Sequence, residues 1–207
     1  MIYPQQNRLK HWVLDTYVRM AVKRNFHQLN VEPVEVSADK SVLLIANHFS
    51  YWDGMLLYYL NQQITGKKFH AMILEETAIK EPMLKYAGGF SVKKNSRDIL
   101  KSLSFAAQLL NDPQNMVLIF PQGKLYSNFI GEVTFEPGIS KIMQQANGKF
   151  QLMLAAIFAE TFEHKKPVAN VYLSNEQQPG STTTADVQRL YQQHYNRAHA
   201  QQTKIVL

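Results

Sequence analysis

Six short apolar runs alternate along this chain with segments of helical periodicity. Each run has the length and composition of a strand that is buried on both faces of a sheet. Helix stop signals such as Asn111-Asp112-Pro113 and Asn147-Gly148 end helical segments that lie between the runs. The alternation predicts a single α/β domain in which helices flank a largely parallel central sheet. The runs cover residues 42–46, 71–74, 89–92, 116–120, 152–158 and 168–173.

The segments between the runs predict helices, and a further helix is expected near the carboxyl end of the chain. That last helix follows the Thr182–Thr184 cluster, which can cap it. In open parallel sheets, ligands bind at the loops that leave the carboxyl ends of the strands, so chemistry is expected there. The other predicted helices cover residues 54–61, 77–86, 96–111 and 137–146.

Residues 8–29 predict one basic amphipathic helix, which Pro33 would end. Trp12, Tyr17 and Met20 supply its apolar side. Such a helix can lie on an anionic membrane with the apolar side down, or it can cover the core of the domain. The residues alone leave both uses open. The helix suggests a division into an N-terminal segment, residues 1–32, and a main domain, residues 33–207.

Composition limits the chemistry and the partners. Because the 207 residues include no cysteine, disulfides, thiolate zinc sites and cysteine nucleophiles are excluded. The formal net charge of +6 favours acidic partners, among them nucleic acid, anionic lipid headgroups, phosphorylated cofactors and an acidic carrier protein. The first residues lack the features of a secretory signal, and no run reaches the ~18 to 20 apolar residues of a membrane span. We therefore expect a soluble or peripheral protein.

The first candidate site directly follows the first apolar run. His48 and Asp53 are five residues apart in a loop that then opens a helix. An aspartate that accepts from one imidazole nitrogen fixes the tautomer and leaves the other nitrogen as a general base for a hydroxyl. If that hydroxyl belongs to the substrate, no serine nucleophile is required. Taken alone, such a pair is more often a structural hydrogen bond.

Two further segments carry groups suited to anions. Pro121-Gln122-Gly123-Lys124 follows the fourth run, and its amides and ammonium group can form an anion pocket. Three cations, Lys93, Lys94 and Arg97, follow the third run at a density that suits a phosphate. Considered separately, the first segment is also consistent with a simple turn and the second with solvated surface.

Together these segments resemble the glycerolipid acyltransferase family, of the lysophosphatidic-acid acyltransferase type. Residues 47–53 match its N-H-x-x-x-x-D block, and residues 88–93 match its glycine-plus-cation block. Residues 120–124 are similar to its F-P-E-G-T-R-S block, and residues 135–138 to its F-K-x-G. An apolar strand at residues 154–158 lies where the fourth block falls. The resemblance covers roughly residues 40 to 160, and it implies an α/β acyltransferase domain behind a membrane-contacting helical segment.

The resemblance implies roles for particular residues. His48 would deprotonate the acceptor hydroxyl, with Asp53 orienting it, and the acceptor would attack the thioester of an acyl-CoA or an acyl carrier protein. Either donor would be a co-substrate, and no cofactor is implied. The substrate-binding candidates are Asn47, Ser50, Lys93, Lys94, Arg97, Phe120, Pro121, Gln122, Gly123 and Lys124.

The chain departs from the family pattern in the third block. Gln122 replaces the glutamate of the family, and Lys124-Leu125-Tyr126 replaces Thr-Arg-Ser. Gln122 can still donate and accept hydrogen bonds but carries no charge, and a point-charge lysine does not reproduce an arginine fork. We therefore expect a lipid or lipid-like alcohol or amine as the acceptor, which need not be lysophosphatidic acid.

Other functions remain open at this stage. The altered third block is compatible with a non-catalytic protein that binds lipid or acyl carrier protein, and water in place of the acceptor would give a thioester hydrolase. No helix-turn-helix, RNP-like or zinc-ligand pattern supports nucleic-acid binding. No histidine pair has metal-ligand spacing, so no metal is predicted. The expected location is cytoplasmic and peripheral, on the inner face of the cell membrane.

Overall fold

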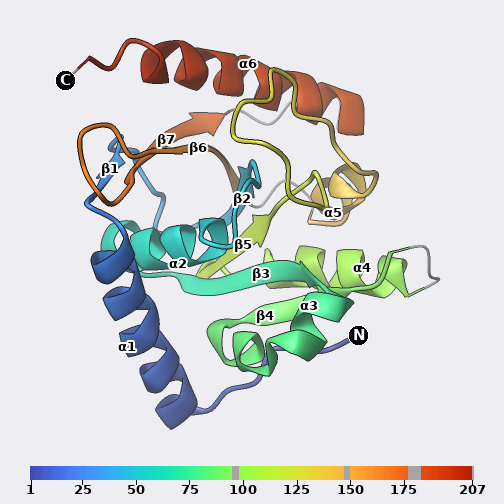
Figure 1. Ribbon diagram of the computed structural model, residues 1–207. Helices are drawn as coiled ribbons and strands as arrows, with labels where there is room; N and C mark the ends of the chain where they lie inside the picture. The colour runs from blue at the N-terminus through green and yellow to red at the C-terminus, as the bar shows by residue number, and fades with distance from the viewer. Residues whose placement is uncertain (95–97, 147–149, 177–182, 207) are drawn as a thin grey trace.

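A computed structural model describes residues 1–94, 98–146, 150–176 and 183–206. Within these residues the chain forms one seven-stranded sheet in the order β1-β7-β6-β2-β5-β3-β4 (Figure 1). All neighbouring strands are parallel except β6 and β7, which form an antiparallel pair. The strands are β1 (Gln28–Val31), β2 (Ser41–Ala46), β3 (Lys68–Leu74), β4 (Gly89–Val92), β5 (Asn115–Ile119), β6 (Phe150–Glu160) and β7 (Val168–Glu176).

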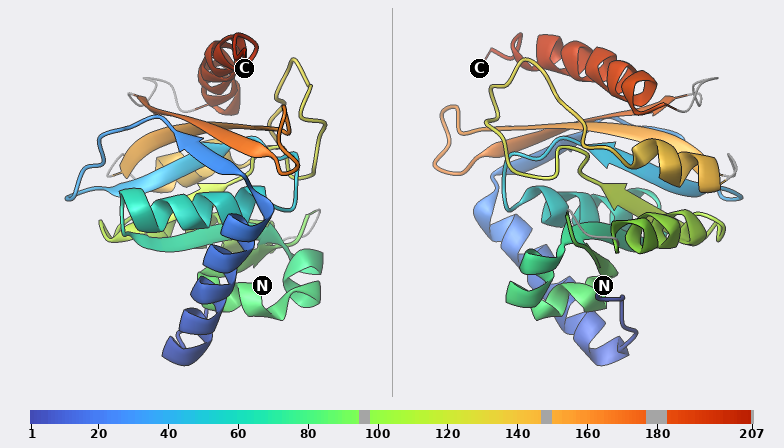
Figure 2. Two further views of the ribbon diagram at one scale, coloured as in Figure 1. Left: turned by 60° about the vertical axis from the view of Figure 1, so that its left-hand side comes forward. Right: turned by 90° about the vertical axis from the view of Figure 1, so that its right-hand side faces the viewer.

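Helices cover both faces of the sheet. In both views of Figure 2, α6 lies on one side of the molecule and α1 on the other. One core cluster joins the sheet to α4, α5 and α6, and a second joins it to α1 and α2. The helices are α1 (Arg8–Asn25), α2 (Asp53–Ile64), α3 (Glu75–Lys80), α4 (Ile99–Leu109), α5 (Ile139–Gln145) and α6 (Thr184–Gln202), with a 3₁₀ helix, η1 (Pro82–Ala87).

Strand β2 lies at the centre of the sheet and shows why an apolar run folds this way. Successive side chains of a strand point to opposite faces. Val42 and Leu44 therefore belong to the cluster under α1 and α2, whereas Leu43 and Ile45 belong to the cluster under α4, α5 and α6. All of these side chains are buried, and each contributes about 1.5–3 kcal/mol by leaving water. A strand that is buried on both faces must be apolar throughout.

The structure confirms the predicted single α/β domain and places a strand at each of the six apolar runs. The prediction of one helix over residues 8–29 was wrong at its carboxyl end. Helix α1 ends at Asn25, the backbone at Phe26 is extended, and Gln28–Val31 form the edge strand β1 against β7. The alternation of polar and apolar residues from Gln28 to Val31 has the period of a strand. The division at residue 32 stays a prediction.

The helix predicted over residues 77–86 is also corrected, because the structure has two shorter elements there. Helix α3 ends at Lys80, and η1 begins at Pro82. Proline lacks an amide hydrogen and clashes with the preceding helical turn, so a continuous helix is broken at this point. Two residues of the predicted helix over 96–111 lie outside the described residues. None of the helices described is both long and apolar enough to cross a membrane.

Tyr191 and His194 are among the α6 side chains that hydrogen-bond to the sheet. The Tyr191 hydroxyl donates to the carbonyl oxygen of Ala155 at 2.7 Å. The His194 ring lies between the Ser174 hydroxyl, 3.0 Å from Nδ1, and the carbonyl oxygen of Tyr172, 3.1 Å from Nε2. Burial lowers the pKa of His194 to about 4, so the ring is neutral at pH 7. His194 is therefore a structural histidine of the core.

Candidate active site

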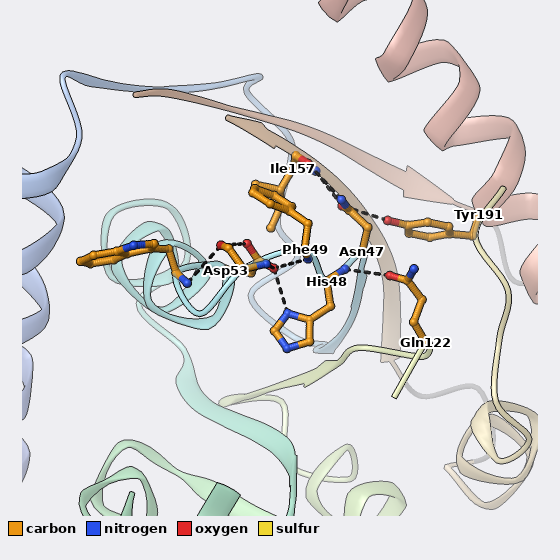
Figure 3. A network of polar contacts seen from close by, with 9 residues as sticks. Asn47, His48, Phe49, Asp53, Gln122, Ile157 and Tyr191 are labelled. Atoms are coloured by element: carbon orange, nitrogen blue, oxygen red, sulfur yellow. Dashed lines mark hydrogen bonds and ion pairs between the residues drawn. The ribbon is translucent and has the colours of Figure 1, made fainter. Parts of the chain in front are cut away.

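The centre of the site is a contact between His48 and Asp53, just beyond the carboxyl end of β2. Asp53 is the first residue of α2, and its Oδ2 lies 2.8 Å from His48 Nδ1 (Figure 3). The Asp53 side chain is 0% exposed, whereas that of His48 is 24% exposed. His48 Nε2 has no hydrogen-bond partner in the described parts of the chain. The dyad therefore leaves one imidazole nitrogen available to a ligand.

The loop before α2 surrounds the Asp53 carboxylate with donors. The backbone amides of Phe49 and Ser50 donate to Oδ2 at 2.7 and 2.9 Å, and the Ser50 hydroxyl donates to Oδ1 at 2.7 Å. The carboxylate also lies at the N-terminus of a helix, where negative charge is favoured. These contacts hold an ionised carboxylate in one orientation. They favour the tautomer in which His48 Nδ1 carries the proton and Nε2 carries the lone pair.

Asn47 links the site to the neighbouring strand. Its side-chain nitrogen donates to the carbonyl oxygen of Ile157 at 2.9 Å, and its side-chain oxygen accepts from the Ile157 amide at 2.8 Å. The side chain thus continues the pairing of β2 and β6 one step past the end of β2. Asn47 is buried and both ends of its amide contact protein. Its direct contribution is to fix the backbone next to His48.

Residues after β5 contact His48 from the other side. The ring of Phe120 stacks on the imidazole, with a centroid separation of 4.1 Å and an interplanar angle of 14°. Gln122 Oε1 accepts the backbone amide of His48 at 2.8 Å, and the Tyr126 amide donates to the His48 carbonyl oxygen at 2.9 Å. Because β2 and β5 are adjacent and parallel, two segments that are distant in sequence meet at this edge.

Lys93 and Lys94, two of the predicted basic residues, contact different carboxylates. Lys94 reaches the third block: its Nζ lies 2.9 Å from Glu136 Oε1, and a Cβ added at Gly123 would come within 2.6 Å of that Nζ. Gly123 also has a φ of +63°. Both this positive φ and the close approach of Lys94 favour a glycine at this position. Lys93 Nζ is 3.9 Å from Glu75 Oε2.

The remaining predicted substrate-binding residues are distributed around the same loops. Lys124 Nζ lies 5.1 Å from the centroid of the Tyr126 ring, and Pro121 is buried at the end of β5. Arg97 lies outside the described residues. The sequence assigns no role to Glu136 or Tyr126, because their contacts depend on how the loops pack. Across the described ranges, no group of three or more His, Asp or Glu residues could hold a metal ion.

This fold and this loop arrangement define an α/β domain with a histidine–aspartate pair at the carboxyl edge of its sheet. The model of the Acyltransferase family matches residues 23–170, which is most of the chain. The chain therefore belongs to the glycerolipid acyltransferase family, and acyl transfer is its general activity. A search of curated proteins gave no match.

Proposed function

We propose that the protein transfers a fatty acyl group from a thioester to a hydroxyl or amine of a lipid-like acceptor, with His48 as the general base. His48 Nε2 takes the acceptor proton while the acceptor oxygen or nitrogen attacks the thioester carbon. The tetrahedral intermediate collapses, the C–S bond breaks, and the imidazolium returns its proton to the leaving thiolate. Asp53 stays ionised and balances the transient charge on the imidazole.

The observation that carries this proposal is the buried Asp53 carboxylate, which occupies His48 Nδ1, while Nε2 has no partner among the residues that the structure describes. The Ser50 hydroxyl, in the same loop, donates to Asp53 Oδ1 instead of to His48. Ser50 is therefore not activated as a nucleophile. Direct attack by an acceptor needs no covalent enzyme intermediate, which agrees with this arrangement.

The charges near the site guide the choice of substrates. Lys93, Lys94 and Lys124 follow β4 and β5 at the carboxyl edge of the sheet, and cations there suit the phosphates of acyl-CoA or the acidic surface of an acyl carrier protein. Lys94 is paired with Glu136, and an anionic headgroup would have to compete with that carboxylate. We therefore propose a lipid alcohol, lipid amine or lysophospholipid as the acceptor, without requiring lysophosphatidic acid.

The test is thiol release from a long-chain acyl-CoA, and from an acylated carrier protein, with and without a panel of lysolipid and lipid-alcohol acceptors. We expect release that depends on an acceptor, together with an acylated product. Release that needs no acceptor would indicate a thioester hydrolase. Absence of release with either donor and every acceptor, combined with measurable ligand binding, would indicate a non-catalytic binding protein.

We further propose that α1 rests on the inner face of the cell membrane and keeps the protein peripheral. Leu14, Val18 and Val22 bury one side of α1 in the core. The opposite side is also apolar and is exposed, since Trp12 is 63% and Met20 is 66% exposed. Cations flank this second face, and an apolar stripe with basic edges suits an anionic bilayer. The exposed stripe is Leu9, Trp12, Val13, Tyr17 and Met20, and the cations are Arg8, Lys10, Arg19, Lys23 and Arg24.

Tyr17 of this stripe is close to Tyr51, which belongs to the loop that carries His48. Burial raises the pKa of the Tyr51 phenol, and Glu81 and Tyr17 close to it raise it further. Tyr51 is 58% exposed and is three residues from His48. A bilayer in contact with Tyr17 would therefore also lie near the loop of His48, which suits a lipid acceptor.

Vesicle flotation tests this orientation. We expect the protein to float with phosphatidylglycerol vesicles and to bind pure phosphatidylcholine more weakly. The double variant Trp12→Ser/Met20→Ser should partition at least about tenfold less, because each side chain contributes about 1.5–3 kcal/mol when it is buried in an apolar medium. Leu100→Ser is the matched control, since Leu100 is 49% exposed but lies on α4. A parent protein that stays in solution would contradict the proposal.

A further inference from the structure

The segment of residues 120–126 holds His48 at three points. Phe120 packs against the imidazole ring, the Gln122 side chain accepts the backbone amide, and the Tyr126 amide donates to the backbone carbonyl. Figure 3 shows Asp53 and Gln122 on opposite sides of His48. The backbone and the ring of the histidine are therefore fixed independently, the ring by Asp53 and Phe120 and the backbone by Gln122 and Tyr126.

Gln122 is buried in a way that does not fit a residue that binds the acceptor. It is 2% exposed, and its oxygen is already used by the His48 amide. Its Nε2 is also buried and has no hydrogen-bond partner among the residues that the structure describes. A group that contacts a polar headgroup must be accessible from the entrance. Lys94, whose side chain is 37% exposed and lies over Gly123, meets that condition.

We propose that Gln122 is a positioning residue, whose carboxamide oxygen holds the His48 backbone so that the imidazole meets Asp53 and the acceptor together. The His48 amide lies past the end of β2, where the strand ladder no longer supplies an acceptor. The side chain of Gln122 replaces that missing strand partner from 74 residues away. A shift of about 1 Å in a catalytic group is enough to cost about 100-fold in rate.

The first test does not depend on turnover. The exchange rate of the His48 backbone amide is measured by NMR in the parent and in two variants of Gln122. Gln122→Met removes the acceptor oxygen at similar length, so exchange should be at least about tenfold faster. Gln122→Glu keeps an acceptor oxygen, and the amide should stay protected. Unchanged exchange in Gln122→Met would overturn the proposal.

The second test separates positioning from acceptor binding, and it rests on the proposed acyl transfer. In Gln122→Met, kcat should fall roughly 10- to 100-fold while the KM for the acceptor changes little. Gln122→Glu should restore kcat to within about threefold of the parent, because the amide again has an acceptor. A raised KM with an unchanged kcat in Gln122→Met would instead assign Gln122 to the acceptor and overturn the proposal.

The matched control is Gln151→Met. Gln151 also accepts a backbone amide, that of Ser37 at 2.9 Å, but it lies at the start of β6, at the end of the sheet away from His48. This variant should leave kcat and the exchange of the His48 amide unchanged. If the parent shows no acyl transfer but the His48 amide responds as expected, the proposed function fails while the positioning contact stands.

Discussion

Replacing His48 with alanine is expected to lower kcat/KM for acyl transfer by about 100- to 10,000-fold, the range that general-base catalysis supplies. Without the imidazole, the acceptor must attack with its proton in place, and the departing thiolate has no positioned acid. The loss should appear in kcat, because the ring contributes to the transition state more than to acceptor binding. Acceptor-dependent thiol release, measured for parent and variant at saturating donor, gives the ratio directly.

The fold should tolerate this change. The variant loses the stacking of His48 on Phe120 and the contact with Asp53, whereas the backbone contacts of His48 with Gln122 and Tyr126 remain. His164→Ala is the control. His164 lies in the loop between β6 and β7, where its ring stacks on that of His27 and has no contact with His48 among the described residues. It should retain full activity. Acyl transfer by His48→Ala at the parental rate would exclude His48 as the base.

The local part of the site could be predicted from the sequence, because His48 and Asp53 lie in one loop between a strand and a helix. Their contact depends only on the conformation of that short loop, and not on how distant segments pack. The contact of Asn47 with Ile157 spans 110 residues and depends on the register of β2 against β6. Periodicity indicates that a strand exists and carries no information about its partner, so this contact could not be predicted.

The same reasoning explains the basic residues and the first helix. Lys93 and Lys94 are adjacent in the sequence, yet one is near Glu75 and the other lies against Gly123 and Glu136. Their separation depends on the turn that begins after β4 ends at Val92, and the sequence does not specify how that turn directs the two side chains. In α1, both sides are apolar, and an apolar pattern alone does not tell which side the core will cover. Burial of Leu14, Val18 and Val22 assigns one side to the core.

Asp53→Asn is expected to lower kcat by about 100- to 1,000-fold, the effect of losing one electrostatic contact in a buried site. The asparagine oxygen can take the place of Oδ2 and accept from His48 Nδ1 and from the Phe49 and Ser50 amides. Its nitrogen can then face the Ser50 hydroxyl. The variant thus keeps the geometry and loses only the negative charge that balances an imidazolium. Unfolding in denaturant should show a loss of about 1–3 kcal/mol, since hydrogen bonds to a charged acceptor are the stronger kind.

Comparison with Ser50→Ala separates the charge of Asp53 from its packing. That variant removes the hydrogen bond from the Ser50 hydroxyl to Oδ1 and leaves the three donors to Oδ2 in place. It should cost no more than about threefold in kcat, because the carboxylate remains ionised and oriented. Asp53→Ala is a poorer probe, since it leaves buried donors without any acceptor. If Asp53→Asn folded and retained the parental kcat, the charge would have no part in the reaction, and the proposed proton transfer through His48 would need another source of stabilisation.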